Sequence, residues 1–500
     1  MTHEPGCAPR PTCDLVLRGG RVLDPETGLD AVRDVGIVGD RIFSVSEVPL
    51  EGRRELDVRG LVVAPGFVDL HSHGQSLAET RLQALDGVTT ALELEAGAAP
   101  VSLAYERAAA EGRPVNYGYS ASWARLRRHV LSGSLIVDDG GGPLDRLGED
   151  EWRAPATASQ TGLLLDLLGR EVADGALGIG VLLGYAPATD PAEYVALARL
   201  AASHGVPTFT HARPLVEQDP DIVVDGAEEL TRAAGETGAH MHYCHINSTS
   251  TRHLDRVHGL VERVRAEGAR VTSEVYPYGA GMTSIGSDYF HPDRLAVLGA
   301  TGTPRDVVYA RTGETVSSLG RLLELRAGDP SGLAFIRAFD EDAEPDRVTR
   351  IATLPGAVIA SDAVPFVVEP GRTFDPRTWP PPDHVRTHPR SAGTYGRTLR
   401  VAVRDTGALS LLEAMARCSL EPARILERAA PAMRRKGRLQ PGCDADVVVF
   451  DAERVTDTAT YQRSTSPTAG FVHVLVNGVP VVSDEQLRQD ALPGRPVRGG

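Results

Sequence analysis

The feature that most constrains the fold is an alternation of strand-like and helix-length segments through the middle of the chain. Most of the strand-like segments are rich in apolar or β-branched residues, as strands buried on both faces of a parallel sheet are. Strands that alternate with helices indicate βα units around such a sheet. Eight segments can be assigned, at residues 66–71, 88–95, 115–120, 176–182, 207–211, 240–245, 271–276 and 357–361. Eight is the number that a (β/α)8 TIM barrel, an α/β fold, requires.

Further strand-like segments lie at both ends of the chain, at residues 14–24, 35–43, 445–450 and 472–482. They predict one small β-sandwich formed from both termini. The expected domains are therefore a composite sandwich of residues 1–63 and 437–500 and a barrel of residues 64–436. The stretch between the seventh and eighth strands is too long for one βα connection, so we expect an insertion at about 280–350, with an extra strand at 333–339.

Charge and hydropathy exclude several classes of protein. The formal net charge of the 500 residues is −15, which argues against a nucleic-acid or anionic-membrane partner. No apolar run is long enough to span a bilayer, and the first residues resemble no secretion signal. The sequence predicts a cytoplasmic protein, and it leaves the oligomeric state open.

Histidines and carboxylates gather where the predicted strands end. In a barrel these ends meet at one face, where active sites lie. Imidazoles and carboxylates brought together there are typical of a catalytic Zn²⁺ or a similar divalent ion. The candidates are His71 and His73 on the first strand, Glu93 and Glu95 on the second, His211 on the fifth, His242 and His245 on the sixth and Asp362 after the eighth.

Specific motifs extend this pattern over nearly the whole chain. Residues 64–73, Ala-Pro-Gly-Phe-Val-Asp-Leu-His-Ser-His, resemble the opening motif of the amidohydrolase superfamily. Further segments resemble its N-acyl-D-amino-acid deacylase (D-aminoacylase) branch, and 91–95 with the Cys-His-Ile-Asn-Ser segment look most like D-glutamate deacylase. These segments are 87–90, 175–180, 185–187, 210–213, 275–278, 361–362, 388–390 and 441–446.

The resemblance implies a role for each matched position. His71 and His73 would bind one metal ion, and His211 and His245 a second. Asp362 would be the general base and would also touch the metal. His242 does not match the family's ligand on strand six, so we interpret it as a supporting residue. The expected cofactor is Zn²⁺, as one or two ions, with other divalent metals open.

Two departures concern the bridge between the metals. Many superfamily members use a carbamylated lysine, but the single lysine here, Lys436, lies beyond the eighth strand. D-aminoacylases instead place a cysteine just after the second strand, near Ala96 in this chain, where no cysteine occurs. Glu95 is the natural substitute, and Glu93 is the alternative.

A third departure concerns the substrate. The deacylases carry a lysine two residues after the strand-six histidine, where it helps to bind the substrate α-carboxylate, and this chain has Asn247 there. An arginine suits a carboxylate because its planar guanidinium binds both oxygens. The candidate substrate-binding residues are Asn247, Arg213, Arg390, Tyr278 and His388, and either Tyr278 or His388 could also stabilise the oxyanion.

The histidine and carboxylate pattern predicts a metal-dependent hydrolase. The resemblance implies that it cleaves amides, converting a small-molecule N-acyl-D-amino acid to a D-amino acid and a carboxylic acid. A cyclic-amide hydrolase of the dihydroorotase or hydantoinase kind, or an amidohydrolase of a specialised pathway, is the alternative. A non-catalytic scaffold fits less well because His71, His73, His211, His245 and Asp362 are all present. The stereochemistry of the substrate and the identity of the metal stay open.

Overall fold

The barrel consists of eight parallel strands in the order β17-β12-β11-β10-β9-β8-β7-β6. The computed structural model describes residues 12–136, 144 and 147–500; the first eleven residues of the predicted sandwich segment lie outside this part. The strands are β6 Phe67–Asp69, β7 Val88–Ala98, β8 Asn116–Ser122, β9 Ile179–Val181, β10 Thr208–Thr210, β11 Met241–Tyr243, β12 Val271–Val275 and β17 Ala357–Ile359. All eight predicted strands are thus present, which confirms the α/β barrel.

The barrel closes just beyond the ends of its first and last strands. The backbone N–H of His73 donates to the carbonyl of Ala363 at 2.7 Å, and the N–H of Ala363 donates to the carbonyl of His71 at 3.2 Å. Asp69 adds a side-chain link, because its Oδ1 accepts the N–H of Ser361 at 3.0 Å. The loops that carry His71, His73 and Asp362 are therefore joined to one another by hydrogen bonds.

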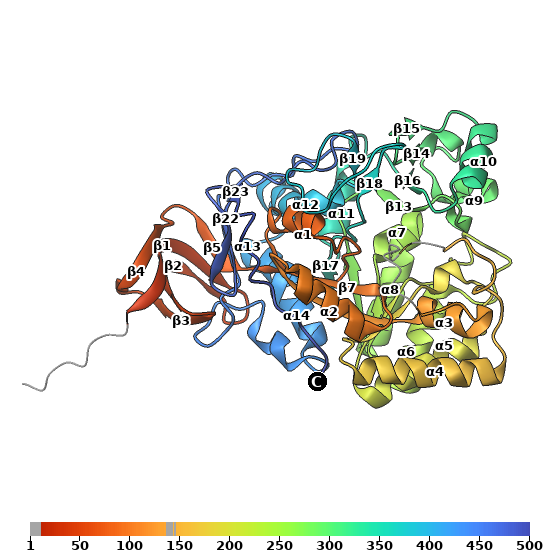
Figure 1. The fold of residues 1–500 in the computed structure, drawn as a ribbon, viewed down its shortest axis with the longest axis horizontal. Coiled ribbons are helices and arrows are strands. Elements are labelled where there is room, and N and C mark those ends of the chain that lie inside the picture. Colours follow the sequence, from red (N-terminus) through yellow and green to blue (C-terminus); the bar gives the residue numbers. More distant parts are fainter. Residues whose placement is uncertain (1–11, 137–143, 145–146) are drawn as a thin grey trace, which may run out of the picture.

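Helices cover the outside of the barrel (Figure 1). Local signals set their ends: α5 begins after the N-cap Asp190, has Pro191 in its first turn and ends at Gly205, whose φ of 72° suits glycine. The helices are α1 Leu77–Ala84, α2 Val101–Glu111, α3 Trp123–Ser132, α4 Ala158–Ala173, α5 Pro191–His204, α6 Gly226–Thr237, α7 Ile246–Ser250, α8 Leu254–Ala266, α11 Pro345–Ala352, α12 Arg390–Thr398, α13 Leu411–Met415 and α14 Glu421–Leu426.

Strands from both ends of the chain form the smaller β-structure seen beside the barrel in Figure 1. Its sheet runs β23-β22-β21-β20-β5-β1-β2-β3, and β4 pairs with β1. The two ends meet where β5 pairs antiparallel with β20. The strands are β1 Cys13–Asp24, β2 Leu29–Val38, β3 Arg41–Ser46, β4 Gly52–Asp57, β5 Val62–Pro65, β20 Val447–Phe450, β21 Phe471–Val476, β22 Val479–Ser483 and β23 Gln486–Leu487.

The expected insertion between the seventh and eighth barrel strands is a separate small layer. Its sheet runs β13-β16-β14-β15 and has a hydrophobic cluster of its own. The expected extra strand at 333–339 is β16, Leu333–Arg337. The other elements are β13 Ala280–Ser284, β14 Val307–Tyr309, β15 Glu314–Thr315, α9 Pro292–Leu298 and α10 Leu319–Gly328; a short pair, β18 Val367–Val368 and β19 Val385–Arg386, follows the barrel.

In the described part of the chain, no helix is both long and apolar enough to cross a membrane.

Candidate metal centre

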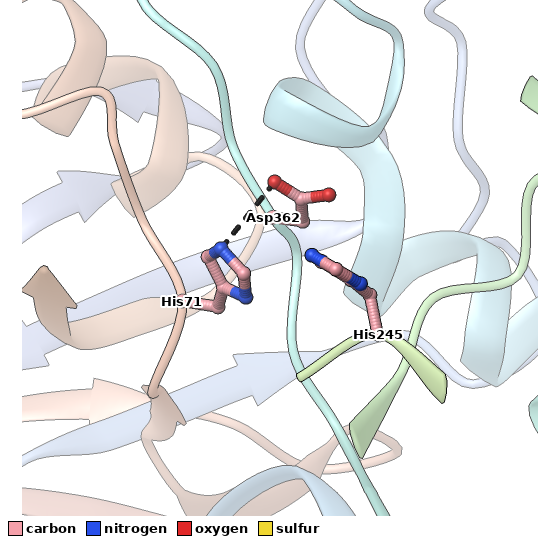
Figure 2. Close-up of side chains that lie close together, drawn as sticks. All are labelled: His71, His245 and Asp362. Carbon is pink, nitrogen blue, oxygen red and sulfur yellow. Dashed lines mark ion pairs between the residues drawn. The ribbon is translucent and has the colours of Figure 1, made fainter. Parts of the chain in front are cut away.

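Six side chains from five barrel strands or the loops that follow them converge at one end of the barrel, and we call them the candidate metal centre. Figure 2 shows three of them, with His71 and Asp362 linked as an ion pair and His245 beside them. All six are buried, with at most 7% of each residue exposed. The six are His71 and His73 after β6, Glu95 in β7, His211 after β10, His245 after β11 and Asp362 after β17.

The carboxylate of Glu95 lies between two pairs of imidazoles. Its Oε2 is 3.4 Å from Nε2 of His71 and 3.5 Å from Nε2 of His73. Its Oε1 is 2.7 Å from Nε2 of His245 and 3.1 Å from Nδ1 of His211. One oxygen therefore faces each pair, which is the arrangement a carboxylate needs to bridge two metal positions.

Asp362 faces the first of these pairs. Its Oδ1 is 3.5 Å from Nε2 of His71 and 3.6 Å from Nε2 of His73. Arg390 holds it from behind: one guanidinium nitrogen is 2.8 Å from Oδ2, and Nε donates to the Asp362 carbonyl at 2.6 Å. Asp362 has a φ of 49° and His245 a φ of 31°, conformations that cost free energy in residues other than glycine. Such strain is frequent at functional sites.

A second set of groups holds the outward-facing ring nitrogens of three of the four histidines, whereas Nδ1 of His245 has no hydrogen-bond partner. Nδ1 of His71 is hydrogen-bonded to Glu274, Nδ1 of His73 lies 2.8 Å from Oε2 of Glu93, and Nε2 of His211 lies 2.6 Å from the hydroxyl of Tyr289. Histidine ligands of metals nearly always have such a partner, which fixes the tautomer and leaves the other nitrogen available to the ion. The donor set therefore fits a divalent metal.

Glu93 and His242 both lie in this outer set. Glu93 and Glu95 are two residues apart, but the register between β7 and β8 shifts after Glu93, so the two carboxylates take different directions. The carboxylate of Glu93 also accepts the N–H groups of Ala96 and Gly97. His242 contacts Glu274 through Nε2 at 3.0 Å. Only Glu95 of the two glutamates stands between the histidine pairs.

Sequence reasoning missed two members of the outer set. Glu274 is a buried acid in β12, and its other oxygen contacts His242. A carboxylate near the end of a predicted barrel strand is the one signal that could have revealed it. Tyr289 belongs to the insertion, in the short turn Asp288–Phe290, and no motif marked it.

The pKa shifts of Glu95, His71 and His73 follow from the close approach of carboxylates and imidazoles in this cluster. Burial alone would raise the pKa of Glu95, but the imidazoles of His71, His245 and His211 hold it well below its usual range. Burial would lower the pKa of His71, and the carboxylates of Glu274, Glu95 and Asp362 instead raise it well above its ordinary value. The pKa of His73 is raised to about 9: burial opposes the shift, and the Glu93 carboxylate and the Glu95 hydrogen bond outweigh it.

Four overlapping groups of side chains place ligand atoms within 4.8 Å of one another. Among the described residues, two of these groups match the two proposed metal positions: His71 with His73 and Glu95, and Glu95 with His211 and His245. The third joins His71, His245 and Asp362. The fourth, His71 with Cys244 and Glu274, lies on the Nδ1 side of His71, and burial raises the pKa of the Cys244 thiol well above its usual range. A neutral thiol is a poor metal ligand, so the first three groups carry the metal hypothesis.

A pocket opens on this centre. Its lining includes His73, Glu95, His211, His245 and Asp362. It also includes Asn247 and Tyr278, but Asn247 is held on both sides by hydrogen bonds with the backbone of Tyr276. The ring of Tyr278 lines the pocket, whereas its hydroxyl faces α12, where a Cβ on Gly393 would be 3.1 Å away. The geometry does not support Tyr278 as the group that stabilises an oxyanion.

Three other predicted substrate-binding residues do not line the pocket. Arg213 is fully buried and is bound to Glu229 at 2.7 Å and to the carbonyl of Thr189 at 2.6 Å. Both ring nitrogens of His388 are in hydrogen bonds, with the carbonyl of Ala280 and the N–H of Arg390. Arg390 is engaged with Asp362. Direct substrate contact by Arg213, His388 and Arg390 stays a prediction, which the described lining of the pocket does not support.

Lys436 is not placed to bridge two metal ions, because it is paired with two aspartates elsewhere. Its Nζ is 3.0 Å from Asp444 and 2.7 Å from Asp446, in a buried ion-pair cluster just before β20. Within the described residues, the only carboxylate between the two histidine pairs is that of Glu95.

Comparison with known proteins agrees with the fold and the motifs. The family model described as "Amidohydrolase family" matches residues 54–482. N-acyl-D-glutamate deacylase of Alcaligenes xylosoxydans xylosoxydans is 28% identical over 97% of this chain and 96% of its own length, and D-aminoacylase of the same organism is 28% identical over 94% and 95%. The crystal structure of N-acyl-D-glutamate deacylase from Bordetella bronchiseptica, complexed with zinc and a phosphonate inhibitor, superimposes with a TM-score of 0.74 at 24% identity, covering 98% of this chain and 100% of that one. The predicted resemblance to the D-aminoacylase branch is confirmed, and the chain belongs to the amidohydrolase family.

Proposed function

We propose that this protein is a Zn²⁺-dependent amide hydrolase, with one or two ions, that deacylates N-acyl-D-amino acids. The observation that carries the proposal is the position of Glu95, with one carboxylate oxygen toward each pair of histidines. The relatives named N-acyl-D-glutamate deacylase and D-aminoacylase, which align over nearly the full chain, support the choice of substrate class.

The residues that would hold the metal are the four histidines and Glu95, with Asp362 close to His71. When bound, a divalent ion supplies Lewis-acid chemistry: it polarises the scissile carbonyl and lowers the pKa of a water molecule. Glu274, Glu93 and Tyr289 orient the imidazoles from outside. This support keeps the site close to its working geometry before the substrate arrives.

Asp362 is the proton carrier in this proposal. Its Oδ1 faces the histidines, and its Oδ2 is held by Arg390 at 2.8 Å. A carboxylate in this position accepts the proton of the attacking water and then delivers it to the nitrogen of the leaving amine. Arg390 acts as a positioning residue because it contacts both the side chain and the backbone carbonyl of Asp362.

The insertion covers the site. Tyr289 and the β13 residues Met282 and Thr283 line the pocket, and the hydroxyl of Thr283 lies 2.7 Å from that of Tyr185, which also lines it. Excluding water strengthens the electrostatic interactions of the enclosed groups and protects the reaction from competing paths.

The test is hydrolysis of matched N-acetyl-D- and N-acetyl-L-amino acids and of cyclic amides, with metal analysis of the same protein sample. We expect release of acetate from D-substrates by protein that contains bound metal. Hydrolysis confined to L-substrates or to cyclic amides, or equal activity in protein freed of metal, would refute the proposal.

A further inference from the structure

The pocket next to the metal centre has an apolar wall with a single fixed positive charge, Arg347. Resting on the proposed function, we infer that Arg347 binds the α-carboxylate of the substrate and that the substrate's own side chain is apolar. This assigns a specificity residue in α11 that none of the sequence motifs contains.

Much of the lining of the pocket is hydrocarbon. Its apolar members come from the insertion, the segment after it and α11, and they include Met282, Leu298, Ile336, Phe339 and Ile351. Among the lining residues that the structure describes, Arg347 is the only arginine or lysine, and the only carboxylates are Glu95 and Asp362 of the metal centre. An apolar wall contributes to binding through burial of apolar substrate surface, whereas a charged substituent placed against it loses its hydration without gaining a partner.

Arg347 is placed at the pocket by a continuous set of contacts. Its guanidinium carbon lies 4.2 Å from the centre of the Phe339 ring. That ring packs against Gly279, where an added Cβ would be 3.1 Å from Phe339 Cε2. Gly279 follows the Tyr276–Tyr278 segment at the end of β12, and its N–H donates to Glu341 at 2.7 Å. The guanidinium is thus fixed on the side of the pocket formed by the seventh barrel strand.

The guanidinium of Arg347 has N–H donors that are available to a ligand. The structure gives it one hydrogen bond, from one terminal nitrogen to Glu344 at 3.3 Å. Both side chains of this pair are partly exposed, 28% for Arg347 and 47% for Glu344. An exposed pair of this kind is weak, and stacking on a ring uses none of the five N–H donors of an arginine. Arg347 can therefore bind both oxygens of a carboxylate.

The other arginines expected to bind the carboxylate, Arg213 and Arg390, are not among the described residues that line the pocket. Arg213 is paired with Glu229, and Arg390 with Asp362. Asn247, at the position where the deacylases carry lysine, is bound to the backbone of Tyr276. Arg347 takes over the role of that lysine from a different element of the fold.

One cation also limits the substrate. An N-acyl-D-glutamate or N-acyl-D-aspartate carries two carboxylates, and only one of them can pair with Arg347. The second would lie against the apolar wall. The pocket therefore favours N-acyl-D-amino acids with side chains such as those of leucine or methionine, although one of the similar proteins is an N-acyl-D-glutamate deacylase.

The test compares Arg347→Met with Arg350→Met in the metal-loaded full chain. Arg350 lies one turn away in the same helix and pairs with Asp255 at the surface, so its variant is the matched control. The substrates are N-acetyl-D-leucine, its carboxamide, which lacks the charge, and N-acetyl-D-glutamate. Thermal unfolding and metal content establish that each variant is folded and loaded.

We expect Arg347→Met to raise KM for N-acetyl-D-leucine by about 10- to 100-fold, the range of a hydrogen bond to a charged group, with a much smaller effect on kcat. It should leave KM for the carboxamide nearly unchanged, and Arg350→Met should change neither. The unaltered protein should prefer N-acetyl-D-leucine to N-acetyl-D-glutamate by at least about 10-fold in kcat/KM.

Two results would overturn the inference and leave the proposed function intact. One is an equal loss of activity on the acid and the carboxamide in Arg347→Met, and the other is a preference of the unaltered protein for N-acetyl-D-glutamate. Failure of the unaltered protein to hydrolyse any N-acyl-D-amino acid would refute the proposed function itself, and the inference with it.

Discussion

Oε1 of Glu95 lies 2.7 Å from Nε2 of His245, while the other oxygen of the same carboxylate faces His71 at 3.4 Å. The carboxylate therefore stands where a ligand shared by two metal positions must stand. Glu93, two residues earlier on the same strand, contacts the outward-facing nitrogen of His73 and the backbone N–H groups of Ala96 and Gly97. The pair provides a matched comparison of a proposed ligand with a supporting residue.

Glu95→Gln should lose most of the bound metal because an amide cannot supply the negative charge of a bridging carboxylate. Glu93→Gln should retain the ligands and lower metal affinity by about 10- to 100-fold, the usual cost of removing an outer partner. Metal content after dialysis against graded chelator separates the two. Equal metal loss in both variants would show that Glu95 does not act as a bridging ligand.

Asp362→Asn should lower kcat by about 100- to 10,000-fold, the usual contribution of a general acid–base group, with metal retained. The asparagine keeps the size of the side chain but cannot carry the proton. Single-turnover kinetics together with metal analysis measure both effects. If the variant keeps most of its activity, Asp362 is not the proton carrier.

Tyr289→Phe removes the hydroxyl that lies 2.6 Å from Nε2 of His211. The imidazole then loses the partner that fixes its tautomer, so we expect metal affinity to fall by about 10-fold or more. Tyr309→Phe is the control, because it removes a hydroxyl of the same insertion that contacts Asp329 instead. A similar effect of both variants on metal affinity would indicate a general loosening of the insertion.

Metal uptake should release protons. In the metal-free protein the pKa of His73 is raised to about 9, so at pH 7.5 this imidazole is protonated and must lose its proton to bind a metal. The apparent affinity should therefore rise with pH, and the share of proton release due to His73 should disappear as the pH passes about 9. Titration calorimetry in buffers of different ionisation enthalpy counts the protons.

The variant Glu93→Gln tests whether the released protons come from His73. The Glu93 carboxylate raises the pKa of His73, so its removal lowers that pKa and fewer protons should be released at pH 7.5. Proton release that is zero in the unaltered protein, or unchanged in Glu93→Gln, would contradict the assignment.

The barrel could be predicted because its strands are short runs of buried residues followed by polar ligands, a pattern that depends on local sequence. The placement of His71, His73, Glu95, His211, His245 and Asp362 at one end then follows from the parallel sheet. The shift of register after Glu93 was not visible in the sequence, so the choice between Glu93 and Glu95 needed the structure.

The substrate-binding residues could not be predicted in the same way. Arg213 and Arg390 lie in matched motifs, and nothing local reveals that Glu229 and Asp362 already neutralise them. Tyr289, Glu274 and Arg347 contact the site or its pocket from distant parts of the chain. Such contacts depend on tertiary packing and leave no periodic pattern.

Reconstitution of the metal-free protein tests the central claim most directly. Zn²⁺ is added in steps, and bound metal and hydrolysis of N-acetyl-D-leucine are measured in the same samples, beside Glu95→Gln. We predict that activity returns as metal binds in the unaltered protein, that the L-enantiomer is not hydrolysed, and that Glu95→Gln recovers neither metal nor activity. Full activity without metal, or full recovery by Glu95→Gln, would contradict a carboxylate-bridged metal hydrolase.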